Sequence, residues 1–150
     1  MMKLISTSTK QTRDIGAKLA KLLKPGDVLA LAGNLGSGKT VFVKGLARGM
    51  GCKEREVLSP TFVLLRQYTG KLTINHFDLY RLKDICQLER IGYEEYFYGA
   101  GVTVVEWADR VKEAMPQENL RVEFKILGEE KRLIQFIPKG RRYADYLRRF

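Results

Sequence analysis

The sequence contains few of the residues that cross-link a protein or bind metals tightly. Among 150 residues there are 2 cysteines, Cys52 and Cys86, and 1 histidine. Two distant cysteines form neither a disulfide framework nor a zinc-ligand pattern, and such sparse use suits a reducing compartment. No apolar run approaches the roughly 18 residues that a membrane-spanning helix needs. We therefore expect a soluble cytoplasmic protein that has no membrane contact and folds without disulfides or a structural metal.

Acidic residues are also scarce beside the basic ones. The chain has 27 Lys and Arg against 17 Asp and Glu, a formal net charge of +10, which favours contact with polyanions or acidic protein surfaces. Part of the excess lies in residues 139–150, which hold one acid, Asp145, and five basic residues, Lys139, Arg141, Arg142, Arg148 and Arg149. Two interpretations stay open for this segment: a solvated helix face, or a contact with RNA or a protein partner.

The strongest motif is a glycine-rich loop between an apolar run and a helix pattern. Residues 33–40 read GNLGSGKT, which matches the phosphate-binding loop G-x-x-x-x-G-K-[ST] at every fixed position. The glycines let backbone N–H groups converge on phosphate oxygens, Lys39 adds a positive charge, and the Thr40 hydroxyl can bind Mg²⁺. The N-terminus of the following helix also favours an anion. The motif predicts a nucleoside triphosphate site; a glycine-rich turn before a helix is the alternative.

The pattern of apolar residues predicts a single domain over residues 1–150, without repeats or linkers. Helical periodicity is found over residues 9–23, 39–50, 84–90, 93–97, 108–114 and 143–149. Short apolar runs predict buried strands at 28–32 and 102–105, and two hairpins that pair 62–68 with 71–77 and 120–127 with 132–137. Together they predict an α/β fold, a P-loop NTPase-like three-layer domain with a mostly parallel core sheet plus added β-hairpins. The nucleotide should lie at the carboxyl ends of the core strands.

Two acidic residues end β-like runs and are, with Lys39, the candidate catalytic residues. Asp78 closes residues 74–78, and Glu106 follows the run 102–105 in the manner of a Walker B acid. A Mg²⁺-nucleotide site needs a carboxylate near the metal and a group that orients the attacking water. The alternative for each acid is a helix N-cap or a surface ion pair. No Asn-Lys-x-Asp element for guanine is found, which favours ATP.

Four further residue positions allow two interpretations each. Ser59 and Thr61 flank Pro60, and their hydroxyls either sense the γ-phosphate or belong to an ordinary turn. Arg81 is a charge stabiliser or, more commonly, a salt-bridge partner. His76 lacks a catalytic partner at close spacing, so we expect it to be packed in the hairpin rather than to act as a base.

Four motifs follow one another along the chain: GNLGSGKT at 33–40, SPTF at 59–62, HFDLYR at 76–81 and EW at 106–107. In their order and spacing they resemble the TsaE family, small ATPases of bacterial tRNA threonylcarbamoyladenosine biosynthesis. The resemblance implies that Thr40 and Glu106 hold Mg²⁺ and that activity depends on Asp78. It also implies nucleotide contacts at Thr9, Thr12 and Arg132, and along the loop at Gly33, Leu35, Gly36, Ser37, Gly38, Lys39, Thr40 and Val41. Asn34 and Ser37 stand where the family usually has Asp and Ala. Neither change touches a fixed residue, so we expect nucleotide binding to be kept.

The same resemblance implies a partner-dependent function. ATP hydrolysis would reset a complex of the threonylcarbamoyl-transferring subunit (TsaD-like) and its inactive paralogue (TsaB-like), while the adenosine beside the tRNA anticodon is modified. Isolated turnover should be slow, and a tRNA contact is an open expectation. Two other functions fit the loop: a P-loop small-molecule kinase, which would form a phosphorylated product, and a non-hydrolytic nucleotide-dependent RNA- or protein-binding module, which would release no phosphate. No clear kinase lid is found between Asp84 and Gly101.

Overall fold

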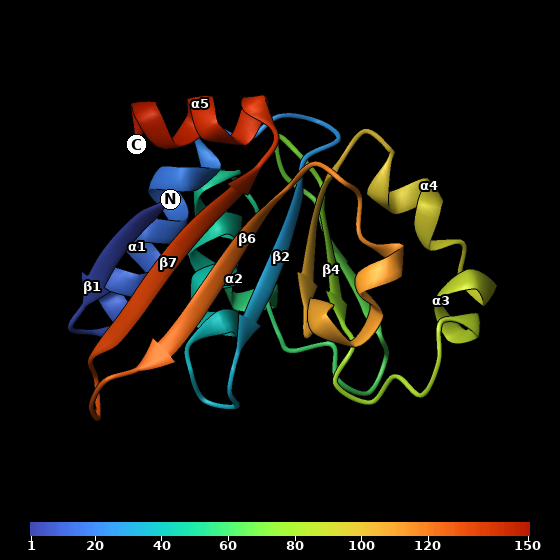
Figure 1. The fold of residues 1–150 in the computed structure, drawn as a ribbon, viewed down its shortest axis with the longest axis horizontal. Coiled ribbons are helices and arrows are strands. Elements are labelled where there is room, and N and C mark those ends of the chain that lie inside the picture. Colours follow the sequence, from blue (N-terminus) through green and yellow to red (C-terminus); the bar gives the residue numbers. More distant parts are fainter.

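One seven-stranded sheet organises the chain. The computed structural model describes residues 1–150, and its strand order is β1-β7-β6-β2-β5-β4-β3 (Figure 1). The strands are β1 (Met2–Ser6), β2 (Val28–Gly33), β3 (Leu65–Tyr68), β4 (Ile74–Asp78), β5 (Val102–Glu106), β6 (Asn119–Ile126) and β7 (Arg132–Lys139). The helices are α1 (Thr9–Ala20), α2 (Lys39–Gly49), α3 (Cys86–Arg90), α4 (Tyr93–Phe97) and α5 (Arg141–Arg149), with the 3₁₀ segments η1 (Glu54–Glu56) and η2 (Ala108–Ala114). None of these helices is long and apolar enough to span a membrane.

The parallel core consists of β6, β2, β5 and β4. Strands β7 and β1 continue the sheet on one side and β3 on the other, all antiparallel to their neighbours. Both predicted hairpins, β3–β4 and β6–β7, are confirmed, and each places one of its strands in the core. The predicted parallel core with added hairpins is therefore confirmed for the four central strands, whereas the three outer strands make the whole sheet mixed.

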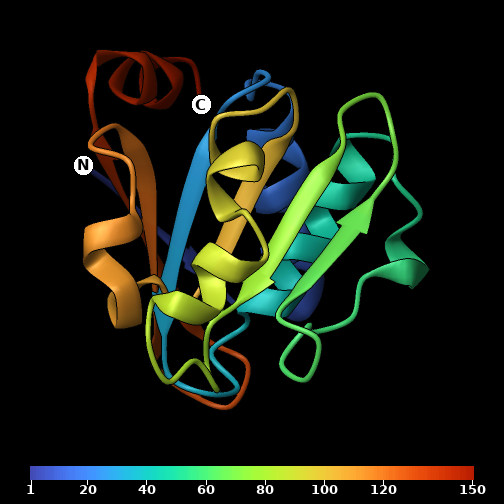
Figure 2. The same cartoon turned by 90° about the vertical axis from the view of Figure 1, so that its right-hand side faces the viewer.

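Helices cover the two faces of the sheet unequally. Helices α1 and α2 pack side by side on one face, and α3, α4 and η2 lie on the other (Figure 2). The close approach of α1 and α2 depends on Gly45, because a Cβ there would collide with the backbone carbonyl of Arg13. Over β1, β7 and β6 the second face carries no helix (Figure 1). The predicted three-layer arrangement is thus correct for the centre of the sheet and wrong for this side, which has two layers.

Two apolar cores follow from the alternation of side chains along the central strands. A cluster of 23 buried residues fills the space beneath α1 and α2, and a second cluster of 10 lies beneath α3, α4 and η2. In β4, Ile74 joins the first cluster and Phe77 the second. Strands buried on both faces read as continuous apolar runs, which is why residues 28–32 and 102–105 were recognisable in the sequence.

Several predicted boundaries and the type of one helix differ from the structure. The first helix ends at Ala20 rather than residue 23, and residues 108–114 form a 3₁₀ segment that is kinked at Val111. Strand β3 begins at Leu65 rather than residue 62, because the Pro60 carbonyl accepts hydrogen bonds from the N–H groups of Val63 and Leu64. This turn takes Phe62 out of the sheet and leaves its side chain 81% exposed.

The basic helix α5 lies at the end of the sheet opposite to the phosphate loop (Figure 1). Its inner side is anchored by two tyrosines: the Val28 N–H donates to the Tyr143 hydroxyl, and the Tyr146 hydroxyl donates to Asp27. Arg142 also pairs with Asp27, while other arginines of the helix face solvent. The predicted helix is confirmed, and its basic residues are remote from the loop.

Candidate functional site

The phosphate loop connects the end of β2 to the start of α2. Gly36 and Gly38 have φ values of 75° and 103°, in the left-handed region that residues with a Cβ rarely adopt. Gly38 is the N-cap of α2, so the loop closes directly onto the free N–H groups of the helix. The glycines of the motif therefore have the conformational role that the sequence predicted for them.

A cavity of about 320 Å³ opens over this loop. Candidate residues from four separate parts of the chain meet in it. It is lined by Leu35, Gly36, Ser37, Gly38, Lys39, Thr40, Val41, Ser59, Thr61, Asp78, Tyr80, Glu106 and Trp107. The structure thus brings the predicted loop residues together with both predicted acids and with Trp107.

Lys39 is the positive charge at the centre of the cavity. Its side chain is buried, and Nζ donates to the carbonyl oxygens of Gly33 at 2.7 Å and Asn34 at 3.0 Å. Nζ also lies 4.5 Å from the centre of the Trp107 ring. Burial lowers the pKa of Lys39, whereas the negative charges of Glu106 and Asp78 oppose that shift. The ammonium group is held close to the loop, beside the two acids that oppose its deprotonation.

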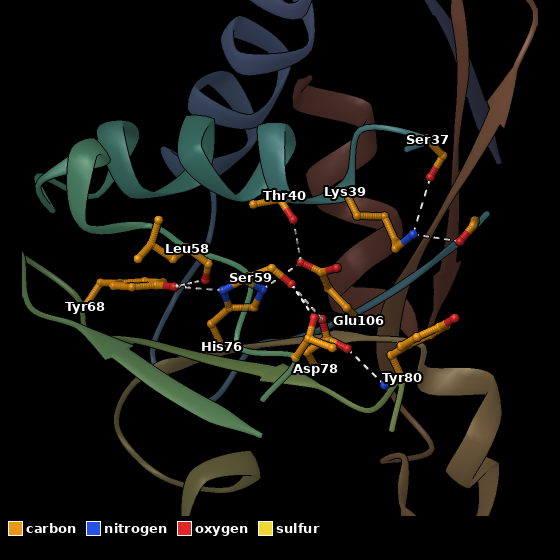
Figure 3. A network of polar contacts seen from close by, with 12 residues as sticks. Ser37, Lys39, Thr40, Leu58, Ser59, Tyr68, His76, Asp78, Tyr80 and Glu106 are labelled. Carbon is orange, nitrogen blue, oxygen red and sulfur yellow. Dashed lines mark hydrogen bonds and ion pairs between the residues drawn. The ribbon is translucent and has the colours of Figure 1, made fainter. Parts of the chain in front are cut away.

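The two carboxylates meet because β5 lies between β2 and β4. Glu106 is the register partner of Leu31 in β2 and of Asp78 in β4. The Thr40 hydroxyl lies 3.3 Å from Glu106 Oε1 (Figure 3). Mg²⁺ prefers oxygen ligands and is commonly held by one or two carboxylates together with substrate phosphates. The paired Thr40 and Glu106 oxygens fit that chemistry.

Asp78 is held by the residues of the SPTF segment. The hydroxyls of Ser59 and Thr61 each donate to Asp78 Oδ2 at 2.8 Å, and the Tyr80 N–H donates to Oδ1 at 2.9 Å. Asp78 is buried and makes no ion pair, so the surface ion-pair alternative is wrong. The hydroxyls that were candidate phosphate sensors are therefore neighbours of the candidate catalytic acid.

The sequence did not predict the environment of His76. It is fully buried in the hairpin, as expected, yet its Nε2 lies 2.8 Å from Glu106 Oε1 and its Nδ1 lies 3.0 Å from the Tyr68 hydroxyl (Figure 3). A signal was present in the sequence: side chains two positions apart on a strand share a face. His76 therefore had to lie on the same face as Asp78.

A second cavity of about 310 Å³ adjoins the other side of the loop. Three residues that the family resemblance singled out, Thr9, Thr12 and Arg132, line it together with Ser8, Gly36, Gly38, Val41, Glu129 and Glu130. Arg132 also donates to the Gly36 carbonyl at 3.3 Å. The structure thus places these residues beside the loop. The acids Glu129 and Glu130 were missed, because no local pattern marks a hairpin tip that reaches the loop from far along the chain.

Arg81 does not form the salt bridge that was the commoner expectation. Its guanidinium lies 4.2 Å from the centre of the exposed Phe62 ring.

Comparison with known proteins identifies the family to which this site belongs. A family model described as "Threonylcarbamoyl adenosine biosynthesis protein TsaE" matches residues 6–134. The chain belongs to the TsaE family. Proteins named tRNA threonylcarbamoyladenosine biosynthesis protein TsaE from Bacillus subtilis and Treponema pallidum are 43% and 42% identical over 95% and 89% of this chain, and over 89% and 98% of their own lengths. The crystal structure of YdiB from Bacillus subtilis aligns with a TM-score of 0.82 and 36% identity, covering 99% of this chain and 92% of YdiB.

Proposed function

We propose that this TsaE-family chain is a cytoplasmic, Mg²⁺-dependent ATPase that serves the threonylcarbamoylation of the adenosine next to the tRNA anticodon. The observation that carries the proposal is the meeting of Lys39, Thr40, Asp78 and Glu106 around one cavity at the carboxyl ends of the core strands. We infer the pathway from the names of the relatives, and the reaction from the residues that line the cavity.

In the proposed reaction the loop N–H groups and Lys39 bind the β- and γ-phosphates. Thr40 and Glu106 hold Mg²⁺, which supplies charge neutralisation on the phosphates. Asp78 orients the attacking water, because its carboxylate is fixed by Ser59 and Thr61 at the edge of the same cavity. The water oxygen bonds to the γ-phosphorus as the bond to the bridging oxygen breaks, which yields ADP and phosphate. Thr9, Thr12 and Arg132 contact the rest of the nucleotide from the second cavity.

Two loops of the site support a partner-dependent reaction. Large apolar side chains are exposed on the phosphate loop and on the loop that contains Ser59 and Thr61, with exposed fractions of 74% for Leu35, 55% for Leu58, 81% for Phe62 and 53% for Val63. Exposed apolar surface is typical of protein contact surfaces. We call these four residues the rim. We propose that TsaD-like and TsaB-like partners cover this rim and that hydrolysis resets their complex. The segment between Asp84 and Gly101 gives less support to a kinase, because Leu88 and Phe97 anchor it on the second core.

Phosphate release from Mg²⁺·ATP tests the proposal, measured for the chain alone and with each partner separately and together. We expect slow release by the chain alone, faster release with both partners, and no release by Lys39→Ala. Equal rates with and without partners would contradict the coupling. Binding without any phosphate release would contradict hydrolysis, and a phosphorylated metabolite would favour a kinase.

A further inference from the structure

A buried chain of hydrogen bonds connects Glu106 to the loop that contains Ser59. Glu106 Oε1 lies 2.8 Å from His76 Nε2, His76 Nδ1 lies 3.0 Å from the Tyr68 hydroxyl, and that hydroxyl lies 3.0 Å from the Leu58 carbonyl oxygen (Figure 3). Tyr68, His76 and Glu106 are 3%, 0% and 3% exposed. Water therefore has little access to this chain, and each polar atom in it depends on its protein partner.

The donors and acceptors of this chain can be assigned from its chemistry. A carboxylate oxygen only accepts, so His76 Nε2 carries the proton that is donated to Glu106 Oε1, and Nδ1 is the acceptor nitrogen of the ring. The Tyr68 hydroxyl proton therefore lies between two acceptors, His76 Nδ1 and the Leu58 carbonyl oxygen, each at 3.0 Å from the hydroxyl oxygen. The raised pKa of Tyr68, about 12 because of its burial, keeps the hydroxyl proton in place. Tyr68 thus fixes the orientation of the imidazole ring, and Glu106 fixes its tautomer.

The contacts of Glu106 are divided between its two oxygens. His76 and Thr40 both contact Oε1, whereas Oε2 has no hydrogen bond from the protein. Ligands that bind metals through one atom are commonly oriented by hydrogen bonds from a second layer of residues. A carboxylate held through Oε1 has its other oxygen free for a cation.

We infer that Tyr68 and His76 are positioning residues, which hold the Glu106 carboxylate in place for Mg²⁺ through a chain anchored on the Leu58 carbonyl. The inference rests on the proposed function, because it takes Glu106 as the Mg²⁺ ligand. It also connects the two acids of the site. Leu58 precedes Ser59, which donates to Asp78, so one loop holds Asp78 directly and Glu106 through Tyr68 and His76.

The experiment measures binding of a fluorescent ATP analogue to the full chain, first in EDTA and then during a Mg²⁺ titration. Tyr68→Phe removes one hydroxyl. His76→Leu removes the contact to Glu106, whereas His76→Gln keeps an N–H donor near the position of Nε2. Tyr98→Phe, at a side chain that is 67% exposed, is the matched control. Melting temperatures identify variants that have lost the fold.

We expect Tyr68→Phe to raise the half-saturating Mg²⁺ concentration about tenfold, with affinity in EDTA unchanged. His76→Leu should raise it further, and His76→Gln should restore part of the loss. Wild-type Mg²⁺ dependence in folded Tyr68→Phe and His76→Leu would overturn the inference and leave the proposed function standing. Absence of Mg²⁺-dependent binding in the wild-type chain would overturn both.

A second readout uses the fact that His76 is the only histidine of the chain. In untagged protein with ¹⁵N-labelled histidine, the imidazole signals belong to this residue alone. We expect Nε2 to be protonated and Nδ1 to be the acceptor, and the Nδ1 signal to move in Tyr68→Phe but not in Tyr98→Phe. An unprotonated Nε2 in the wild-type chain would overturn the inference without reference to nucleotide binding.

Discussion

Asp78 and Glu106 are register partners at the carboxyl ends of two adjacent parallel strands, β4 and β5. Each carboxylate nevertheless has its own set of neighbours. Ser59 and Thr61 hold Asp78, whereas His76 and Thr40 contact Glu106. Different surroundings of two neighbouring acids are typical of acids with different tasks. We therefore propose that Asp78 orients the water and that Glu106 binds Mg²⁺.

This division predicts the effect of Asp78→Asn. The substitution keeps the size of the side chain and removes its charge, so hydrolysis should fall by at least about 100-fold while the affinity for Mg²⁺·ATP changes little. Phosphate release and equilibrium binding, measured on the same preparation, separate the two effects. Asp84→Asn, at an exposed position outside the site, is the control and should hydrolyse at the wild-type rate. An Asp78→Asn variant with unchanged turnover would show that Asp78 does not orient the water.

The contact of α1 with α2 predicts a loss of stability in Gly45→Ala. Alanine favours a helix, but its Cβ would collide with the Arg13 carbonyl, a backbone atom that cannot rotate away. We expect a decrease of about 1–3 kcal/mol in the free energy of unfolding, measured by denaturant titration. Gly128→Ala is the matched control, because the nearest heavy atom to its Cβ would be Lys131 Cβ at 3.6 Å, an ordinary contact. Equal stabilities of the two variants would contradict the close packing of the helices.

Buried tyrosines predict a loss of stability in alkali. Burial raises the pKa of Tyr68 to about 12, and burial together with the hydrogen bond to Asp27 raises the pKa of Tyr146. In the unfolded chain these phenols ionise near pH 10. The folded state thus binds more protons above about pH 10, so its stabilisation is complete below that pH and is lost as the pH rises toward 12.

Denaturant titrations between about pH 8 and pH 11 measure this loss. Tyr68→Phe should lower the steepness of the decline in unfolding free energy, since Tyr68 alone accounts for about 1–1.5 kcal/mol of the loss up to about pH 11. Tyr98→Phe should keep the wild-type slope. The same slope in Tyr68→Phe and the wild type would contradict the protonated, buried state of Tyr68.

The sequence predicted those parts of the site that depend on a short continuous motif. The loop residues Gly36, Gly38 and Lys39 were recognised from their immediate neighbours, and the structure places the loop between β2 and α2 with Gly36 and Gly38 at positive φ, as that motif predicts. The two acids were found because each closes an apolar run. Whether they lie near the loop depends on which strands are neighbours. The structure places β5 between β2 and β4, which brings both acids next to the loop at the end of β2.

The parts that the sequence did not predict depend on long-range pairing or on competition between local preferences. The contact between His76 and Glu106 joins residues 30 positions apart and exists only because β4 and β5 are adjacent. Phe62 and Val63 have strong strand preferences, yet hydrogen bonds to the Pro60 carbonyl close a turn there. The absence of a helix over one face of β1, β7 and β6 could not be predicted for a related reason. Strand β1 pairs with β7, which lies more than a hundred residues away in the sequence.

The central claim is that the loop of residues 33–40 binds ATP through Lys39. Isothermal titration of Mg²⁺·ATP into the wild-type chain, Lys39→Ala and Lys44→Ala tests it most directly, because Lys44 lies in the same helix outside the cavity. We predict equal dissociation constants for the wild type and Lys44→Ala, and a loss of at least about 100-fold for Lys39→Ala. Wild-type affinity in a folded Lys39→Ala variant would contradict the claim.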